Sequence, residues 1–359
     1  MEIKSFIGKK FDNVNEVWKD LRRQIEFDRY LKHQTNVKLT YEYYYPPKNP
    51  IDFLSKRYIL YPLYMRKHTK NLTNNIVYQI HFQFLGDLAN YLDREKTIIT
   101  CHDIYNFLEK NSLRNSIFAQ KYALLGLKKC KYIIAISEFT KNELINKLNI
   151  PKERIFVIKN AINNEMFKPI PQNKSSEIEP LFPNYRKILY VGNESDRKNF
   201  ITLIKAFYLL KKKIKNLKLI RVGSTSNFQL IKKLGLQKDI IYLKYVSNKR
   251  LREIYNLCDI FVTASLYEGF GFPGLEAAAC GTPVICTDIP IFREIYQNFP
   301  IYFPPKDYKK LVRIIIENIN DEEKKKDLGQ KGINLAKSYS WQKSAEEYHK
   351  YVKKIIENN

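Results

Sequence analysis

The chain has 359 residues and a formal net charge of +25, from 62 Lys and Arg against 37 Asp and Glu. This length is enough for two domains, and an apolar fraction of 44% argues against extensive disorder. No apolar run reaches the roughly 20 residues needed to span a bilayer, and the first ten residues lack the apolar stretch of a secretion signal. The five cysteines include no Cys-x-x-Cys pair, so we expect a reduced, cytoplasmic setting without structural zinc.

The excess of positive charge attracts anions such as nucleotide sugars, nucleic acid or an acidic membrane surface. A compositional bias toward lysine explains it equally well, because many lysines fall on the polar side of amphipathic segments such as residues 205–214. The sequence has no zinc-finger spacing and no ribonucleoprotein-type aromatic motif, so no nucleic-acid partner is expected. Charge alone therefore assigns no partner.

Strand-like runs alternate with segments of helical periodicity along most of the chain. In the first half the runs predict strands at residues 75–80, 96–101, 131–136 and 154–158. The periodicity predicts helices near residues 84–94, 115–129 and 138–148. Before them, residues 56–67 are basic and aromatic. We interpret this segment as a buried strand with charged flanks, with contact to an anionic lipid or lipid-phosphate acceptor as the alternative.

Two histidines follow strand-like runs of this first half. His81 comes directly after residues 75–80, and His102 lies in the sequence Thr-Cys-His-Asp that follows the next run. In a doubly wound parallel sheet, a residue at the C-terminal end of a strand faces the ligand site. His81 is therefore a candidate to line the side of that site where an acceptor substrate would bind. A lone histidine is nevertheless more often a core or surface residue. We expect that the main role of Ser137 is to cap the helix at 138–148 and that its secondary role is to line the ligand-binding cleft.

Residues 167–180 are polar and carry three prolines, which indicates a linker or a long surface excursion. The second half then predicts strands at residues 188–191, 217–222, 240–243, 259–262 and 283–286. Such alternation is typical of parallel sheets covered by helices on both faces. We therefore predict an α/β fold with two doubly wound, Rossmann-like domains, residues 1–168 and 169–340, and a cleft between them.

A polar loop follows the first strand of the second half, which ends at Gly192. We expect Asn199 to cap the next helix, whose apolar positions fall on one face. Arg197 and Lys198 would then lie beside a helix N-terminus, where the helix dipole favours anions. Arginine offers a fork of donors to phosphate oxygens and lysine offers a compact charge. The loop predicts phosphate binding, with a solvated basic turn as the alternative.

The most informative segment is residues 265–283, which read Ser-Leu-Tyr-Glu-Gly-Phe-Gly-Phe-Pro-Gly-Leu-Glu-Ala-Ala-Ala-Cys-Gly-Thr-Pro. It follows a strand-like run and opens into a short alanine-rich helix, with Glu276 expected in the first turn. Glycines such as Gly269 and Gly271 let backbone N–H groups approach a phosphate closely. Glu268 and Glu276 can accept hydrogen bonds from hydroxyl groups. A ligand that carries both phosphates and hydroxyls is a sugar nucleotide.

This run, with Glu-Gly-Phe-Gly, Pro-Gly-Leu-Glu-Ala and Cys-Gly-Thr-Pro-Val in order, resembles the Glu-x7-Glu signature of family 4 glycosyltransferases, which are retaining enzymes of the GT-B architecture. The resemblance covers most of the chain and is clearest from Ile98 onward. It implies two Rossmann-like domains that face a central cleft. Taken by itself, the C-terminal segment 341–359 predicts an amphipathic helix whose Trp341 anchors a core. The resemblance implies that residues 341–359 cross back to complete the N-terminal domain.

The resemblance also implies roles around the donor. Arg197 and Lys198 match the basic pair that contacts the donor diphosphate. Glu276 matches a ribose contact, for which a helix-stabilising glutamate is the alternative, and Glu268 matches a residue beside the donor sugar. The remaining donor-binding candidates are Gly192, the base-contacting Tyr245 and Val246, and the loop residues Gly269, Phe270, Gly271 and Phe272.

In the first half of the chain, His102 matches a histidine that the family commonly has near the transferred sugar. Asp103 would then orient that ring or the following turn, and the segment around Ser137 resembles a strand-to-helix segment of the family. The chain departs from the family pattern near its N-terminus. Many relatives carry a glycine-rich loop there that approaches the phosphates and the acceptor, whereas the first 85 residues of this chain contain only Gly8.

These matches predict a metal-independent hexosyltransferase that retains the anomeric configuration. Its donor is expected to be a GDP- or UDP-sugar, and its acceptor a hydroxyl group of a carbohydrate or of a lipid-linked molecule. The expected process is the synthesis of a cell-envelope polysaccharide or glycolipid. Front-face attack, in which a donor phosphate oxygen helps to take the acceptor proton, is favoured over a covalent intermediate on Glu268. The sequence has no Asp-x-Asp pair, so neither a divalent ion nor another cofactor is expected. The expected location is cytoplasmic, with a peripheral position on the inner membrane face.

Two other functions stay open at this point. An inactive GT-B protein that binds polyanions or a membrane surface would fit the +25 charge and the missing N-terminal glycine loop. A sugar-nucleotide epimerase has a related architecture. The matched set as a whole favours transfer over both alternatives; its members are Glu268, Glu276, Arg197, Lys198 and His102.

Overall fold

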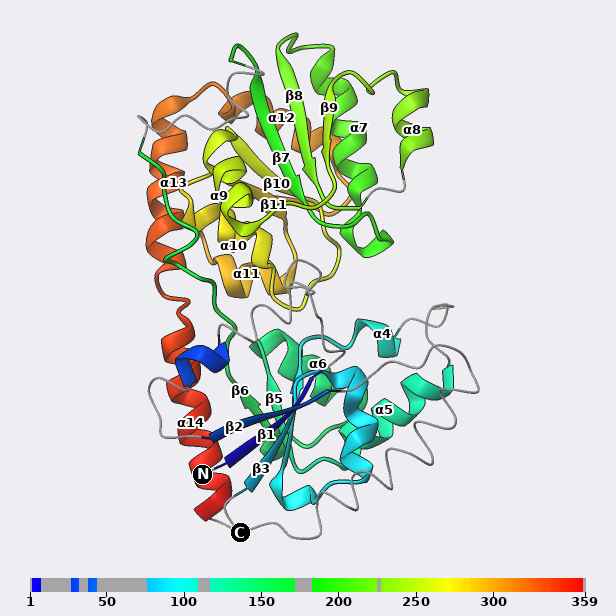
Figure 1. The fold of residues 1–359 in the computed structure, drawn as a ribbon. Coiled ribbons are helices and arrows are strands. Elements are labelled where there is room, and N and C mark those ends of the chain that lie inside the picture. Colours follow the sequence, from blue (N-terminus) through cyan, green and yellow to red (C-terminus); the bar gives the residue numbers. More distant parts are fainter. Residues whose placement is uncertain are drawn as a thin grey trace. The chain divides into compact units, whose positions relative to one another are not determined.

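A computed structural model describes residues 2–7, 27–31, 38–43, 76–108, 117–171, 183–224 and 227–357. The chain divides into two compact units (Figure 1). Unit 1 comprises Met1–Ala161 together with Trp341–Asn359, and unit 2 comprises Ile162–Ser340. The basic, aromatic segment 56–67 lies outside the described residues, and the expected linker 167–180 is described only as far as residue 171.

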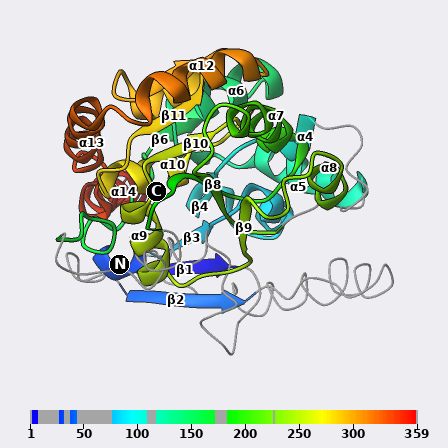
Figure 2. The ribbon, with the colours of Figure 1, turned by 90° about the horizontal axis from the view of Figure 1, so that it is seen from above.

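Unit 1 is built on a parallel sheet with the strand order β2-β1-β3-β4-β5-β6. Its strands are β1 (Glu2–Ile7), β2 (Lys38–Tyr43), β3 (Ile76–Ile80), β4 (Thr97–Cys101), β5 (Tyr132–Ala135) and β6 (Ile155–Val157). The last four fall where the apolar runs predict strands. The sequence did not reveal β1 and β2, which run side by side (Figure 2). Both mix charged and apolar residues, and β2 is the edge strand, so neither reads as a continuous apolar run.

The named helices among the described residues of unit 1 are η3 (Gln83–Asn90), η4 (Arg94–Lys96), α4 (Tyr105–Leu108), α5 (Ile117–Lys129), α6 (Glu138–Leu148), η5 (Lys152–Arg154) and α14 (Trp341–Glu357), and residues 27–31 are helical as well. Where the periodicity predicts one helix near 84–94, the structure has two separate 3-10 segments. Gly86 lowers the preference for an α-helix there. A side chain at Gly86 would overlap a backbone carbonyl of α5, so this glycine permits the close packing of η3 on α5.

Helix α14 supplies part of the core of unit 1. The Tyr348 hydroxyl donates to Gln79 Oε1 at 2.8 Å, and the Ser344 hydroxyl donates to the Lys159 carbonyl at 2.7 Å. Trp341 is buried, and its ring packs edge-on against Phe27. The C-terminal segment of the chain is thus integral to the N-terminal sheet rather than to unit 2.

Unit 2 is also built on a parallel sheet, with the order β12-β11-β10-β7-β8-β9. Its strands are β7 (Arg186–Val191), β8 (Leu217–Val222), β9 (Ile240–Leu243), β10 (Ile260–Thr263), β11 (Val284–Thr287) and β12 (Ile301–Phe303). Numbered within the unit, this is the Rossmann order 3-2-1-4-5-6 read from the β9 edge. The predicted α/β fold with two parallel, doubly wound sheets is confirmed.

In the part of unit 2 that the structure describes, the helices are η7 (Asp196–Lys198), α7 (Phe200–Lys211), α8 (Phe228–Lys233), α9 (Asn248–Leu257), α10 (Phe272–Ala279), α11 (Pro290–Tyr296), α12 (Tyr308–Asn318) and α13 (Glu322–Ala336). Helices α7 and α12 pack together over one face of the sheet, and α9, α10 and α13 lie over the other (Figure 1). Because β7 and β10 are neighbours, the winding direction reverses between them. Ligands of doubly wound sheets bind beside that point.

Candidate functional site

The loops that follow β7 and β10 meet at the reversal point of the unit 2 sheet. The backbone N–H of Leu266, after β10, donates to the carbonyl of Arg197, after β7, at 2.7 Å. Each loop carries part of the predicted site, because the first holds Arg197 and Lys198 and the second holds Glu268. The topology therefore brings together residues that lie about 70 positions apart in the chain.

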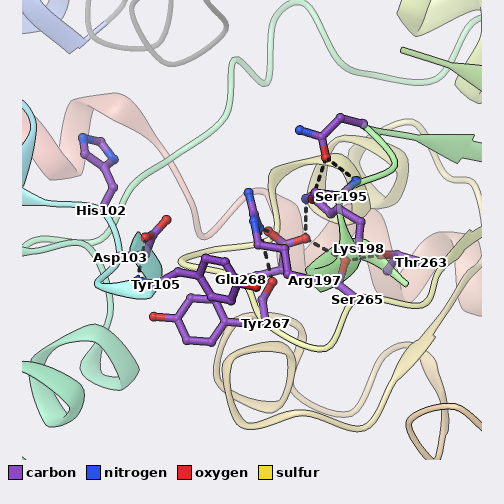
Figure 3. Close-up of polar contacts among 12 residues, drawn as sticks. His102, Asp103, Tyr105, Ser195, Arg197, Lys198, Thr263, Ser265, Tyr267 and Glu268 are labelled. Atoms are coloured by element: carbon purple, nitrogen blue, oxygen red, sulfur yellow. Dashed lines mark hydrogen bonds and ion pairs between the residues drawn. The ribbon is translucent and has the colours of Figure 1, made fainter. Parts of the chain in front are cut away.

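Glu268 is the centre of a charged cluster (Figure 3). Arg197 Nη1 donates to Glu268 Oε2 at 3.1 Å, and Lys198 Nζ forms an ion pair with Oε1. The Ser265 hydroxyl also donates to Oε1, at 2.8 Å. Glu268 is only 7% exposed. The cluster joins the predicted cationic pair to the first glutamate of the Glu-x7-Glu run.

The pKa of Glu268 is set by two opposing effects. Burial raises it, but the positive charges of Lys198 and Arg197, with hydrogen bonds from Lys198 and Ser265, outweigh burial and hold the pKa below its usual value of 4.5. The carboxylate is therefore ionised at neutral pH. Two cations and one carboxylate leave one net positive charge on a site with several N–H donors, and such a site suits an anionic, oxygen-rich ligand.

Helix α11 holds in place the glycine-containing loop that precedes α10. Gly271 has φ +93°, a left-handed conformation that favours glycine, and the Tyr296 hydroxyl donates to its carbonyl. A side chain at Gly274 would overlap that same hydroxyl. The rings of Phe270 and Phe272 pack together at 4.8 Å. These contacts define the backbone path that leads into the N-terminus of α10.

Glu276 lies in the second turn of α10, not in the first turn as the sequence predicts. The reason is that the helix begins only at Phe272, directly after the left-handed Gly271. The carboxylate is 5% exposed, and its Oε2 accepts a hydrogen bond from the Tyr255 hydroxyl of α9 at 2.9 Å. This position is too far from the helix start for the helix-stabilising role that an N-terminal glutamate plays.

The remaining donor-side candidates lie at C-terminal strand ends of unit 2. Gly192 follows β7, and its N–H donates to the Val222 carbonyl of β8 at 2.9 Å. Tyr245 and Val246 follow β9; Tyr245 is 51% exposed and Val246 is half-buried. The same end of the sheet thus carries the glycine, the base-side pair and the charged cluster.

Asn199 precedes α7 but does not cap it with its side chain as expected. Its φ of 49° is left-handed, and the amide nitrogen instead donates to the Ala264 carbonyl at 3.1 Å. The amide oxygen accepts from the Thr202 hydroxyl at 2.9 Å. The side chain therefore ties the basic loop to the end of β10 rather than satisfying the helix N-terminus.

In unit 1, His102 contacts its neighbours through both its ring and its backbone. Its Nε2 lies 2.9 Å from the His81 carbonyl, its ring stacks on Phe82 at 5.1 Å, and its backbone N–H donates to Gln83 Oε1 at 3.1 Å. The Asp103 carboxylate accepts from the Tyr105 N–H at 3.1 Å (Figure 3). Of the two functions expected for Asp103, this contact matches support of the following turn.

His81 and Ser137 are both buried in unit 1. His81 is 2% exposed and lines a small cavity under α14 with Gln79, Thr100 and Tyr348. Burial, with a smaller contribution from His102, lowers the pKa of His81 to about 3, so the ring is neutral. Ser137 is fully buried, and its hydroxyl accepts from the Thr140 N–H at 3.0 Å. The expected helix cap is present.

Sequence reasoning missed the residues that hold the site together. Ser265 stands inside the informative run, yet nothing in the pattern marks it as a donor to Glu268. Tyr255 and Tyr296 lie in ordinary amphipathic helices, and only the fold brings their hydroxyls to the Glu276 carboxylate and the Gly271 carbonyl. In the described part of the chain, no cluster of three or more His, Cys, Asp or Glu side chains is suited to bind a metal ion. No helix there is long and apolar enough to cross a membrane.

Two family models match the chain. The model described as Glycosyl transferases group 1 matches residues 171–335, and the model described as Glycosyltransferase Family 4 matches residues 26–165. Together they cover most of both units.

Two of the similar proteins are bacterial mannosyltransferases. The O-antigen chain mannosyltransferase B of Escherichia coli is 28% identical over 69% of this chain and 68% of its own length. The O-antigen chain mannosyltransferase RfbU of Salmonella typhimurium is 32% identical over 59% of this chain and 57% of its own. The match thus spans about two thirds of the first relative and little more than half of the second.

Among solved structures, Anabaena Alr3699/HepE in complex with UDP and glucose has a TM-score of 0.77 and 17% identity. The match covers 99% of this chain and 100% of that one. At this identity the likeness establishes the fold, which is that of GT-B glycosyltransferases.

Proposed function

The chain belongs to glycosyltransferase family 4, and from this membership we propose that it transfers a hexose, with retention, from a nucleoside-diphosphate sugar to a hydroxyl acceptor. The observation that carries the proposal is the cluster of Arg197, Lys198 and Glu268 at the reversal point of the unit 2 sheet. Its cations would contact the diphosphate, and its carboxylate would accept hydrogen bonds from the sugar.

The chemistry required of the site is stabilisation of a departing diphosphate. Negative charge grows on the leaving oxygen as the glycosidic bond breaks, and preorganised cations lower the energy of that state. Arg197 and Lys198 are already oriented by their ion pairs with Glu268, so little reorganisation is needed. We propose that these two side chains take the place of a divalent ion, since the sequence has no Asp-x-Asp pair to hold one.

Glu268 suits hydroxyl recognition better than proton transfer. Its lowered pKa keeps it ionised, so it accepts hydrogen bonds but has no proton to give. Both oxygens of this carboxylate are already engaged, Oε2 by Arg197 and Oε1 by Lys198 and Ser265, so we favour front-face attack, in which a donor phosphate oxygen helps to take the acceptor proton, over a covalent intermediate on Glu268. In unit 1 we assign His102 to the transferred sugar, in line with the family pattern.

The donor base is open between GDP and UDP. Mannosyl transfer is named for both O-antigen relatives, whereas the structural neighbour was solved with UDP. We assign the ribose to Glu276, whose carboxylate is oriented by Tyr255, and the base to the loop that holds Tyr245 and Val246. By analogy with the O-antigen that both relatives' names give, we propose a cell-envelope polysaccharide or glycolipid acceptor. We also propose a peripheral position at the inner membrane face.

The test is a donor screen followed by two substitutions. The purified protein is ranked against a panel of GDP- and UDP-sugars by thermal shift, and release of the nucleoside diphosphate is then followed with the best donor. Lys198→Ala and Glu268→Gln should each lower turnover by roughly 100-fold or more. Lys331→Ala is the matched control, because Lys331 forms an exposed pair with Asp327 on α13. Unchanged turnover in both site variants would refute the proposal, and no shift with any donor would favour the inactive, polyanion-binding alternative.

A further inference from the structure

A buried ion pair lies beneath the loop that carries the cationic residues. Glu194 belongs to that loop and Arg221 to β8, and each side chain is only 1% exposed. Arg221 Nε lies 2.6 Å from Glu194 Oε1. Removing two charges from water costs more than their attraction commonly returns, so a neutral pair of the same size would fold at least as well. Stability alone therefore does not explain why the charges are there.

The pair connects three separate segments at the C-terminal end of the sheet. Arg221 donates to the carbonyl of Gly223 and approaches that of Gly192 at 3.5 Å. The second oxygen of Glu194 accepts from the backbone N–H and the side-chain amide of Asn227, at 2.8 and 2.7 Å. The network thus joins the loop after β7, the end of β8 and the residue before α8.

The surrounding backbone has little freedom to adjust. Gly223 has φ +130°, and a side chain there would overlap the Gly192 carbonyl. The Tyr190 hydroxyl donates to the Asn193 carbonyl at 2.6 Å. Arg221 also lies 5.6 Å above the ring of Phe200, the first residue of α7. Both ends of the basic loop are therefore tied to this one guanidinium.

We propose that Glu194 and Arg221 are positioning residues, which fix the path of residues 192–198 and so aim Arg197 and Lys198 at the donor diphosphate. This inference rests on the proposed function. Neither side chain needs to touch the donor, because the pair acts through the carbonyls of Gly192 and Gly223 and through Asn227. The planar guanidinium holds its carbonyl partners in fixed geometry, and its charge holds the Glu194 carboxylate beside it as an ion pair.

The decisive variant replaces both charges, Glu194→Gln with Arg221→Met. It should melt within a few degrees of the parent, because no unpaired charge is left buried. The donor KM should nevertheless rise about tenfold, since a small displacement of binding groups weakens donor contacts. Each single substitution should melt lower than the double variant. A double variant with parental KM and kcat would overturn the proposal.

A second readout separates this proposal from the donor assignment. Hydrogen exchange of residues 192–198, measured without any ligand, should be faster in the double variant even if no nucleotide sugar proves to be the donor. Unchanged exchange there would also overturn the proposal. The control is Arg186→Gln with Asp259→Asn, which removes the ion pairs that these residues form with each other and with Glu322 and Lys325 at the opposite end of β7. It should alter the melting temperature without altering the donor KM or the exchange of the loop.

Discussion

At the scale of single residues, opposite environments separate the two titratable groups of greatest interest. Glu268 is buried beside two cations, which keep its pKa low and its charge fixed. Among the described residues, no negative charge compensates the burial of His81, and His102 adds a repulsion, so the ring stays neutral. A fixed charge suits ligand binding, whereas a neutral buried ring suits packing. The buried position of His81 thus speaks for a structural role.

His81 makes the stability of the protein depend on pH. Its pKa is lowered from 6.5 to about 3 in the folded state, whereas the unfolded chain regains the ordinary value. Between these values the unfolded state binds a proton that the folded state excludes. The contribution of His81 to the free energy of unfolding should therefore fall as pH drops below 6.5, by at most about 1.4 kcal/mol per pH unit, and should be constant above that pH.

The comparison that isolates this effect is His81→Gln, which keeps a polar group of similar size but has no proton to bind. Urea unfolding of both proteins at several pH values between 7 and 4 gives the two slopes. Carboxylates such as Glu268 titrate in both proteins and cancel in the difference. The parent should lose stability more steeply than the variant below pH 6.5, and parallel curves would contradict a neutral, buried His81.

At the scale of elements, α9 connects the linker side of unit 2 to the proposed ribose contact. Asn256 Oδ1 accepts from the Ile170 N–H at 2.7 Å, and the ring of Phe167 packs edge-on against Tyr255. The hydroxyl of the same tyrosine donates to Glu276. One helix therefore holds both the segment that enters unit 2 and a carboxylate of the candidate site.

Tyr255→Phe should weaken donor binding without unfolding the protein. The ring contacts stay, but Glu276 loses one hydrogen bond, which is worth about 1 kcal/mol, or roughly a fivefold rise in donor KM. We expect kcat to change little, because the contact proposed for Glu276 is with the ribose and not with the reacting atoms. Tyr208→Phe is the control, since Tyr208 lies on α7 and its cation–π contact with Lys212 involves only the ring. An unchanged KM in Tyr255→Phe would remove Glu276 from the ribose site.

Elements differed in how readily the sequence revealed them. Strands buried on both faces, such as β4 and β10, read as apolar runs and were predicted to within a residue. The mixed strands β1 and β2 carry no such signal. Helix starts depend on single dihedral angles: Ser137 caps α6 as expected, whereas the left-handed Asn199 and Gly271 alter the entry to α7 and α10. No periodicity reports those angles.

At the scale of the whole molecule, the chain order hides which residues become neighbours. The family motifs named Arg197, Lys198 and Glu268, and the strand order explains why they meet: β7 and β10 are adjacent although two strands lie between them in sequence. The supporting contacts of Ser265 and Tyr255 depend on packing that no local pattern encodes. Likewise, the last helix joins unit 1 through partners such as Gln79, 269 positions away.

The division of the chain into two compact units predicts that unit 2 folds alone. Residues 162–340 contain a complete six-stranded sheet with its own core and the whole charged cluster. The isolated fragment should therefore melt cooperatively by circular dichroism and shift with the same nucleotide sugar as the full chain, while failing to transfer the sugar. Residues 1–161 alone should not fold stably, because they lack the buried Trp341, Tyr348 and Val352 of α14. A unit 2 fragment that melts without cooperativity, or that ignores a donor which shifts the full chain, would show that donor binding needs more than the cluster around Glu268.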